Sequence, residues 1–466
     1  MKSCDALIIG AGMGGLAAAA LWAKKGHKVY LVESHYSSGG CAGYFKRREG
    51  PYDVGATTLS GLRDGRPVRK VIDKLNLNID IAQSDPGIVV HMDGSVINMY
   101  SDLRKLSNEF KKNFSIDCHS TLKKWKGYED ALWKALDVPS NFPYLKFKEL
   151  LSLFRKDTRV LLFKPQLFFK SFYDFMPKFM RESSDFVRFI DQLLLISTQQ
   201  TSKTCPAFMG ILGLFYPMDT YSISGGMRIL AKTLEKSIKA HGGKILFKSP
   251  CERIVRVQGG YGIYTKKEVF FTKNLISNIS PEVFNTLLEG PGFKQNKGKI
   301  WGANVAYLNI KAKRPIEKLY HQIHDQEGSL FFSISRPEAD SMIQRITVSS
   351  HVDVDDYEKR DNHYELNKER FQKRALAAFN KHLLNENIET VKVESIGTPL
   401  TFKHYTGRPK GEVGGLIHHS VFSLFRLMPN KVPSEDIYFV GDYTFPGQGI
   451  VSVFQSALNS IKNMSH

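Results

Sequence analysis

The sequence predicts an α/β fold: a discontinuous Rossmann-like domain with a second, mixed α+β domain inserted into it. Three observations predict it. A glycine-rich turn separates two short apolar runs at the start of the chain, and a second strand-to-helix turn lies near its end. The length of 466 residues exceeds the roughly 50–250 typical of one domain. The hydrophobic fraction of 42% is sufficient for a sizeable core.

The first predicted unit is a strand, a tight turn, a helix and a second strand. Residues 7–9 and 29–32 are apolar runs, and an alanine-rich stretch lies between them. The turn has the spacing G-x-G-x-x-G, which permits a sharp turn, close approach of the backbone to a diphosphate and tight packing of helix on sheet. Its residues, which we expect to bind a dinucleotide, are Gly10, Gly12, Met13, Gly14 and Gly15.

Glu33 ends the second strand, 23 residues after Gly10. A carboxylate there can accept hydrogen bonds from the hydroxyls of an adenosine ribose and would repel a 2'-phosphate. The alternative is an ordinary glycine turn in an unrelated α/β domain. The agreement of strand, helix and acidic strand end favours the dinucleotide.

A second glycine pair follows this unit. Gly39 and Gly40 precede residues 43–44 and 52–55, a pattern that resembles the extended fingerprint of the FAD-dependent amine oxidase and phytoene desaturase superfamily. The resemblance implies that FAD is the cofactor and that Ser34, Gly39, Gly40 and Cys41 lie against it. A flexible surface loop is the alternative for the glycine pair.

The middle of the chain continues the same order of elements. Residues 224–227 precede an amphipathic helix over 228–240, which two glycines close, and strands follow at 244–247 and 250–255. In the superfamily the chain re-enters the FAD domain at this point. The resemblance implies that the backbone near Cys251 contacts the adenine, while its thiol is a small buried group without a role.

The C-terminal segment carries the second strong signal. Residues 436–440 form a buried-strand pattern that ends at Gly441 and Asp442, and Gly449, Ile450 and Val451 open a final helix. A carboxylate at that strand end can bond a ribityl hydroxyl, and the positive helix end can stabilise a reduced flavin. An ordinary helix cap is the alternative for Asp442.

Residues 441–449, Gly-Asp-x-x-Phe-Pro-Gly-Gln-Gly, closely resemble the phytoene desaturase, carotenoid isomerase and retinol saturase branch, as do residues 397–411. This resemblance implies an FAD-dependent oxidoreductase that acts on C–C or C=C bonds of an apolar polyene or isoprenoid. Desaturation, saturation and cis–trans isomerisation stay open. The alternatives are a flavin amine oxidase and a non-enzymatic, membrane-associated flavin-binding protein.

A segment over residues 144–182 is dense in phenylalanine and carries nine basic and four acidic side chains. It fits a membrane-docking lid through which a lipid-soluble substrate enters, or a helical subdomain with an aromatic core and a basic face. The net charge of +19 favours an anionic partner, and the absence of a nucleic-acid reading motif favours an anionic membrane. The phenylalanines are Phe147, Phe154, Phe163, Phe168, Phe169, Phe172, Phe175 and Phe179.

The five cysteines are odd in number and lack metal spacing, so we expect reduced thiols, no metal and a cytoplasmic location, peripheral on the inner face of a membrane. The longest uncharged run, residues 7–23, is too rich in glycine for a signal peptide or a membrane span. The sequence does not predict an oligomeric state.

The expected division of the chain places residues 1–99, 218–295 and 425–466 in the FAD-binding domain. Residues 100–217 and 296–424 form the substrate domain, with a helical lid and with strands over 302–310, 330–334 and 345–352. Catalytic side chains are not evident, because a hydride can pass directly to the flavin. The weak candidates for a base are His404, Tyr405 and Tyr221.

Overall fold

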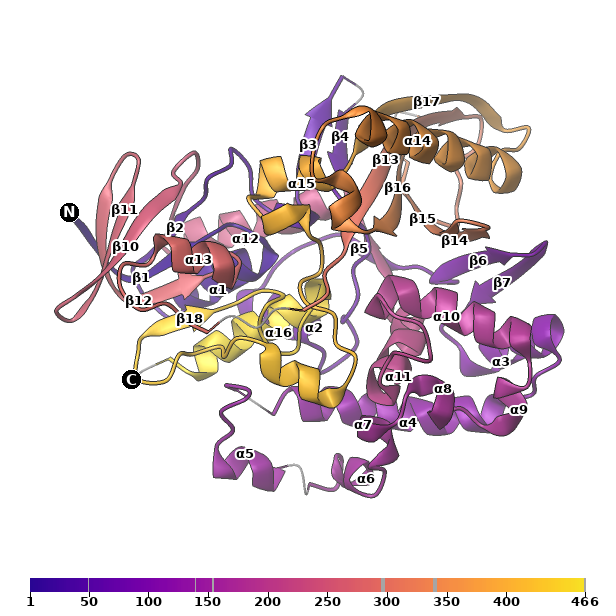
Figure 1. Cartoon of the computed structure of the whole chain (residues 1–466), viewed down its shortest axis with the longest axis horizontal. Helices are drawn as coiled ribbons and strands as arrows, with labels where there is room; N and C mark the ends of the chain where they lie inside the picture. Colours follow the sequence, from indigo (N-terminus) through magenta and orange to yellow (C-terminus); the bar gives the residue numbers. More distant parts are fainter. Residues whose placement is uncertain (49, 139, 153–154, 295–297, 338–341, 465–466) are drawn as a thin grey trace.

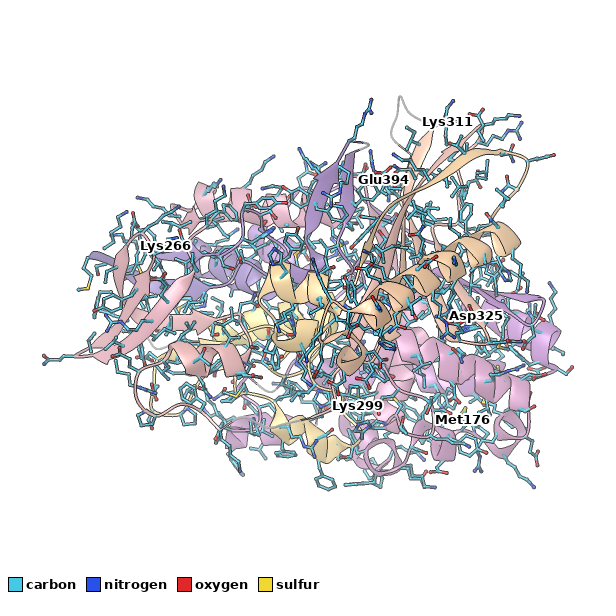
Figure 2. The ribbon with its side chains drawn as sticks, turned by 45° about the horizontal axis from the view of Figure 1, so that its top comes forward. Met176, Lys266, Lys299, Lys311, Asp325 and Glu394 are labelled. Atoms are coloured by element: carbon cyan, nitrogen blue, oxygen red, sulfur yellow. The ribbon has the colours of Figure 1, made fainter. Side chains whose placement is uncertain are left out.

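The computed structural model describes residues 1–48, 50–138, 140–152, 155–294, 298–337 and 342–464. Two seven-stranded sheets form its framework. Figure 1 shows the first sheet at the left, the second at the upper right, and a group of helices at the lower right. Figure 2 shows Lys266, Lys299 and Lys311 well apart from one another on the molecule.

The first sheet has the order β10-β11-β12-β1-β2-β9, with β18 paired to β12. Its strands β9, β2, β1, β12 and β18 run parallel, and β10 and β11 form an antiparallel extension. The strands are β1 (Lys2–Ile9), β2 (Val29–Val32), β9 (Lys244–Leu246), β10 (Cys251–Val257), β11 (Gly260–Thr265), β12 (Val269–Ser277) and β18 (Ile437–Phe439).

Helix α1 (Met13–Lys24) packs between α12 (Met227–Ala240) and α16 (Gly449–Lys462). Its residues from Met13 to Ala23 are all buried, and its alanines let the neighbouring helices approach closely. Helix α2 (Pro67–Leu75) packs against α16, and α13 (Pro281–Leu287) covers β10. Short strands β3 (Tyr44–Arg47) and β4 (Gly50–Asp53) form a hairpin, and β5 (Ile81–Gln83) pairs with β8 (Tyr221–Ile223).

The second sheet has the order β17-β13-β16-β15-β14-β6-β7. Helix α14 (Asn362–His382) buries Phe371 and Phe379 against Leu308 and Phe332 of this sheet. The expected strands lie within β13, β15 and β16, whereas β14 and β17 were not expected. The strands are β6 (Ile88–Met92), β7 (Ser95–Met99), β13 (Gly302–Ala312), β14 (Tyr320–Asp325), β15 (Gly328–Ile334), β16 (Ile343–Val352) and β17 (Ile388–Gly397).

The boundary expected at residue 99 does not coincide with the division between the two sheets. Strands β6 and β7 belong to the second sheet, because β6 pairs in parallel with β14 from His321 to Ile323. The first segment therefore leaves the first sheet before residue 88. Every residue of β6 is buried, so its pattern is that of any interior strand, and only this distant pairing assigns it to a sheet.

The helical region packs around an aromatic core that includes Phe110, Trp125, Phe172, Phe186 and Phe189. Phe172 of the predicted aromatic segment is buried there, whereas Phe147, Phe163 and Phe169 are exposed, so the segment serves both as core and as surface. Phe154 lies outside the described residues. The helices are α3 (Leu103–Phe114), α4 (His119–Leu136), α5 (Phe147–Ser152), α6 (Arg159–Leu162), α7 (Gln166–Phe169), α8 (Phe172–Phe175), α9 (Lys178–Arg181), α10 (Ser184–Thr198) and α11 (Ala207–Phe215).

Helix α15 (Pro399–Thr406) follows β17 and lies against the first-sheet loops. Short 3-10 turns η4 (Pro409–Gly411) and η5 (Val421–Arg426) then lead the chain back towards β18. Among the helices that the described residues form, none combines the length and apolar character needed to cross a membrane.

We predict that Gly15→Ala destabilises the protein by about 1–3 kcal/mol, the usual range for overpacking. A Cβ at Gly15 would lie 2.1 Å from the carbonyl oxygen of Gly10, so α1 would have to move off the sheet. Gly127→Ala is the matched control. It is exposed in α4 with open space around it, and alanine should stabilise that helix by about 0.5–1 kcal/mol. Urea unfolding measures both, and equal effects would refute the packing argument.

Candidate functional site

A cavity of about 1680 Å³ opens at the carboxyl edge of the first sheet. Residues of the first-sheet loops, the second sheet, the helical region and α15 all line it. Sites for a single small ligand usually measure about 300–1,000 Å³. The cavity therefore has room for a dinucleotide and a second molecule.

Three glycine loops form one wall of this cavity, where parallel strands end. A Cβ at Gly12 would lie 2.5 Å from Nδ2 of Asn278, and one at Gly14 would lie 3.1 Å from the nitrogen of Gly441. A Cβ at Gly40 would lie 3.3 Å from Cα of Gly12. The loops after β1, β2 and β18 thus touch through backbone, which leaves N–H groups available to a diphosphate.

The structure places all the predicted cofactor-binding residues on the lining of the cavity, except Gly15. Gly15 faces the carbonyl oxygen of Gly10, where the missing side chain lets α1 pack on the sheet. The predicted residues on the lining are Gly10, Gly12, Met13, Gly14, Glu33, Ser34, Gly39, Gly40, Cys41, Cys251, Gly441, Asp442, Gly449, Ile450 and Val451.

Glu33 is held in place by backbone donors. The N–H of Ala11 donates to its Oε2 at 2.6 Å, and the N–H of His35 donates to its Oε1 at 2.8 Å. The Ser34 hydroxyl also donates to Glu33, at 3.1 Å. The carboxylate is thus oriented before any ligand binds, as recognition of ribose hydroxyls requires.

The thiols of the two cysteines that line the cavity are not expected to be reactive. Burial raises the pKa of the Cys41 thiol to about 11 and that of Cys251 to about 12. Both therefore stay protonated near neutral pH, and a thiolate is the form that would react. They serve as small neutral surfaces for a ligand.

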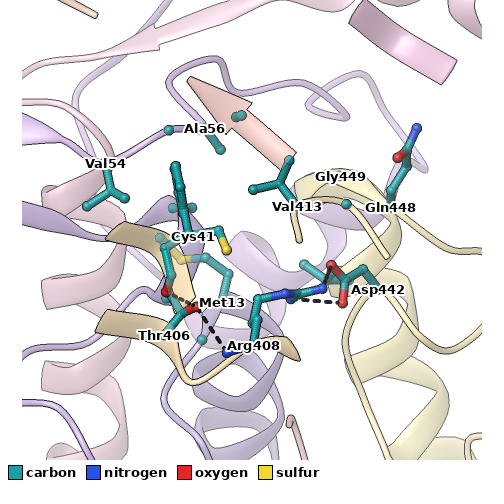
Figure 3. Close-up of a pocket in the computed structure, with 18 of the residues that line it drawn as sticks. Met13, Cys41, Val54, Ala56, Thr406, Arg408, Val413, Asp442, Gln448 and Gly449 are labelled. Atoms are coloured by element: carbon teal, nitrogen blue, oxygen red, sulfur yellow. Dashed lines mark hydrogen bonds and ion pairs between the residues drawn. The ribbon is translucent and has the colours of Figure 1, made fainter. Parts of the chain in front are cut away.

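Asp442 belongs to a partly buried cluster of charges, in which Asp442 and Arg408 are shown in Figure 3. Arg408 donates to its carboxylate through both terminal nitrogens, at 2.8 and 3.3 Å, and also lies 3.4 Å from Glu412. Burial raises the pKa of Glu412 to about 7. Burial opposes the charge on Arg408, but the nearby negative groups outweigh it and raise the pKa of the guanidinium.

The three candidate bases do not gather at one place. Tyr221 does not line the cavity. It pairs with β5, and its carbonyl oxygen accepts from the Tyr320 hydroxyl, so the structure does not place this candidate with the other two. His404 and Tyr405 line the cavity on α15, but Tyr405 is 52% exposed and its ring lies 5.7 Å from that of His35. Both thus lie near Glu33, at the adenosine end.

The sequence did not predict the apolar wall of the cavity, which lies beside the C-terminal motif and includes one of its residues. These side chains come from α4, α10, α11 and η5 and from the motif itself, and their periodicity resembles that of any helical core. They are Leu136, Leu195, Phe208, Met209, Leu212, Phe215, Leu424 and Phe445. Arg408 was also missed. The signal that could have found it is the turn marked by Gly407 and Pro409 on either side of it, because such residues constrain the backbone.

The residues present fit FAD. Glu33 and the backbone near Cys251 would hold the adenosine, the glycine loops the diphosphate, and Asp442 with the start of α16 the flavin end. Bound FAD supplies two-electron chemistry by accepting or giving a hydride. The chain itself positions the ligands and keeps water out of the apolar part of the cavity.

We predict that Glu412→Gln stabilises the apoprotein relative to wild type, increasingly so as pH rises. The unfolded chain ionises Glu412 near its ordinary pKa of 4.5, whereas the folded protein does so at about 7. As pH rises between these two values, the free energy of unfolding of the wild type therefore falls by up to about 3 kcal/mol. The glutamine variant has no such group and does not lose this stability. Urea unfolding across this range measures the difference. Glu358→Gln, at an exposed site, is the control, and a difference that does not change with pH would refute the prediction.

The family model for flavin-containing amine oxidoreductases matches residues 13–460. A prolycopene isomerase of Daucus carota is 25% identical, with 97% of this chain aligned to 78% of that protein. An all-trans-retinol 13,14-reductase of Macaca fascicularis is 24% identical, with 98% of this chain aligned to 85% of that protein.

Solved structures of the same fold include an oxidoreductase from Methanosarcina mazei and a putrescine oxidase redesigned in its cofactor binding. The first has a TM-score of 0.64 at 16% identity and aligns 99% of this chain with all of that one. The second has a TM-score of 0.64 at 14% identity and aligns 99% of this chain with 98% of that one. With its glycine cradle and its fold, this chain belongs to the flavin-containing amine oxidoreductase family and is an FAD-dependent oxidoreductase.

Proposed function

We propose that this protein performs redox or redox-assisted chemistry on the C–C and C=C bonds of an apolar polyene or isoprenoid, by desaturation, saturation or cis–trans isomerisation. The apolar wall beside the C-terminal motif is the observation that carries the proposal. Its side chains offer dispersion contacts and no charge, which suits a long hydrocarbon. Prolycopene and all-trans-retinol, named in the relatives' descriptions, are both polyenes.

The chain's part in this chemistry is to orient the substrate and to exclude water. Leu195, Leu212 and Phe208 line the cavity from α10 and α11, and Phe445 enters it from the motif beside Asp442. A hydrocarbon held between these walls would have its reacting carbons close to the start of α16. Exclusion of water protects both a hydride and any charged intermediate from the solvent.

Amine oxidation is the second candidate, because proteins of the same fold include putrescine oxidase. A cationic substrate would need a free carboxylate or an aromatic cage. Two acidic groups line the cavity near the helical region. Glu129 is paired with Arg66, whereas Asp219 accepts from the N–H of Gly61 through Oδ2 and has no hydrogen-bond partner at Oδ1 in the described structure. Hydrogen peroxide release with an amine substrate would favour this candidate.

We predict that Leu212→Gln lowers kcat/KM for a polyene at least about fivefold while FAD stays bound. An amide without a partner in an apolar cavity costs about 1–3 kcal/mol. Leu366→Gln is the control, since Leu366 is 63% exposed on α14 and does not line the cavity. The assay follows polyene absorbance and chromatography with the holoprotein in detergent micelles. Failure of wild type to alter lycopene-type and retinol-type polyenes would overturn the proposed reaction.

We further propose that the substrate enters from an anionic membrane through an aromatic rim, defined as Phe147, Phe163, Phe169, Phe422 and Phe425. Each is at least 55% exposed. Helices α5, α6 and α7 belong to the aromatic segment, residues 144–182, and Figure 1 shows them in the lower part of the molecule. Exposed basic side chains of residues 144–182 are Lys146, Lys148, Arg155, Lys156, Arg159, Lys170 and Lys178. Aromatic rings and lysines together suit a headgroup interface.

The rim connects with the cavity through neighbouring aromatic rings that are tilted relative to one another. The ring of Phe169 lies 6.2 Å from that of Phe422, and Phe425 lies 5.0 Å from Phe142. Phe142 in turn lies 4.8 Å from Phe445, which lines the cavity. An apolar molecule leaving a bilayer at the rim would therefore meet apolar surface along this path.

We predict that the wild-type protein sediments with vesicles containing phosphatidylglycerol and is partly released by salt. Phe163→Ser combined with Phe422→Ser should weaken this binding roughly tenfold or more, since each exposed ring contributes apolar area in the interface. The control, Leu384→Ser, changes an exposed apolar side chain after α14. Equal binding of the double variant and wild type would show that the rim is not part of the docking surface. Binding that does not depend on salt would show that the basic side chains do not contribute to it.

A further inference from the structure

Arg408 enters the cofactor cavity from a constrained loop after α15. Gly407 before it has a φ of 67°, and Gly411 after it has a φ of 72°. A Cβ at Gly411 would lie 1.7 Å from the carbonyl oxygen of Pro399, so this loop is pressed against the start of its own helix. The backbone around Arg408 is thus fixed before any ligand binds.

The guanidinium has donors left over. Arg408 carries five N–H groups, and Asp442 engages one on each terminal nitrogen. Its Nε is buried and has no hydrogen-bond partner in the described structure. A planar fork with free N–H groups matches phosphate oxygens in geometry and in charge.

Arg408 is also the most enclosed arginine or lysine of the described cavity lining. Its side chain is 19% exposed, whereas Lys368 is 36% exposed, and Arg47, Arg360 and Lys403 are exposed residues. Charge interactions strengthen as water is excluded. The cation that matters most to a buried anion is therefore Arg408.

The position of Arg408 relates it to the diphosphate part of FAD. Its partner Asp442 follows Gly441, whose nitrogen lies 3.1 Å from the place of a Cβ at Gly14. The charge of Arg408 also acts on Cys41, next to Gly40, which touches Gly12. Arg408 therefore stands beside the same loops whose N–H groups face the diphosphate (Figure 3).

We propose that Arg408 is a cofactor-binding residue whose guanidinium bridges the Asp442 carboxylate and the diphosphate of FAD. Without it, a buried carboxylate and a dianion would share one cradle and repel each other. The N-terminus of α1 offers only about half a positive charge against them. This role is independent of which substrate the enzyme oxidises or reduces.

The bridge also has a mechanical consequence. Arg408 follows β17 of the second sheet, whereas Asp442 follows β18 of the first. A diphosphate held by both would tie the two parts of the chain together, and bound FAD should raise the thermal stability of the whole protein.

The test titrates apoprotein with FAD and with ADP by calorimetry. ADP carries the adenosine and the diphosphate but no flavin. Arg408→Met should weaken both ligands by roughly 10- to 100-fold, as expected for a charge-assisted pair. Lys410→Met, which removes an exposed lysine paired with Asp355 in the same loop, should change neither by more than about twofold.

Arg408→Lys keeps the charge but loses the fork, and it should weaken both ligands by about three- to tenfold. The lysine variant replaces the methionine variant in this test if the latter does not fold, and a thermal melt of the apoprotein shows whether it folds. Loss of FAD affinity with unchanged ADP affinity would overturn the proposal, because Arg408 would then act only at the flavin end through Asp442. Unchanged affinity for both ligands would overturn it as well.

Discussion

The close approach of three backbone loops at the carboxyl edge of the parallel sheet is the constraint on which the rest of the structure depends. Asn278, directly after β12, is central to it. Its N–H donates to the carbonyl oxygen of Ile9 at 2.9 Å, and its side chain lies within 4 Å of the Cβ positions of Gly12, Gly14 and Gly15. No side chain larger than hydrogen fits at those three positions without displacing Asn278. The glycines therefore do two things at once: they let α1 pack on the sheet, and they leave bare backbone for a cofactor.

The same edge concentrates charge. Helices α1 and α16 both begin there, which favours anions, while Glu33 and Asp442 bring carboxylates to it. Glu33 is balanced by backbone N–H groups, and Asp442 is balanced by Arg408, which lies 34 residues earlier in the chain, after α15. The binding of a dinucleotide is thus divided between donors that are local in sequence and one cation that only folding brings near.

The parts of the site that could be predicted are those with a local signal. Each of these parts can be recognised from a few consecutive residues, because strand, turn and helix differ in hydrophobic period and in their need for glycine. They are the turn after β1, Glu33 at the end of β2 and the strand-to-helix turn at Asp442. Gly15 was placed correctly in its packing role, but it does not reach the cavity. The aromatic segment was ambiguous, since one face of it became core through Phe172 and another became surface through Phe163.

By itself, the sequence determined the FAD-binding wall, because each piece of that wall is a short strand and the turn that follows it. The tertiary structure alone decided which sheet β6 joins, that Tyr221 lies away from the cavity, and that Arg408 meets Asp442. It also decided that helices from the middle of the chain supply the apolar wall. The reason is physical. Hydrophobic periodicity records that a residue is buried, but not which element buries it, and a contact between residues that are tens to hundreds of positions apart leaves no local pattern.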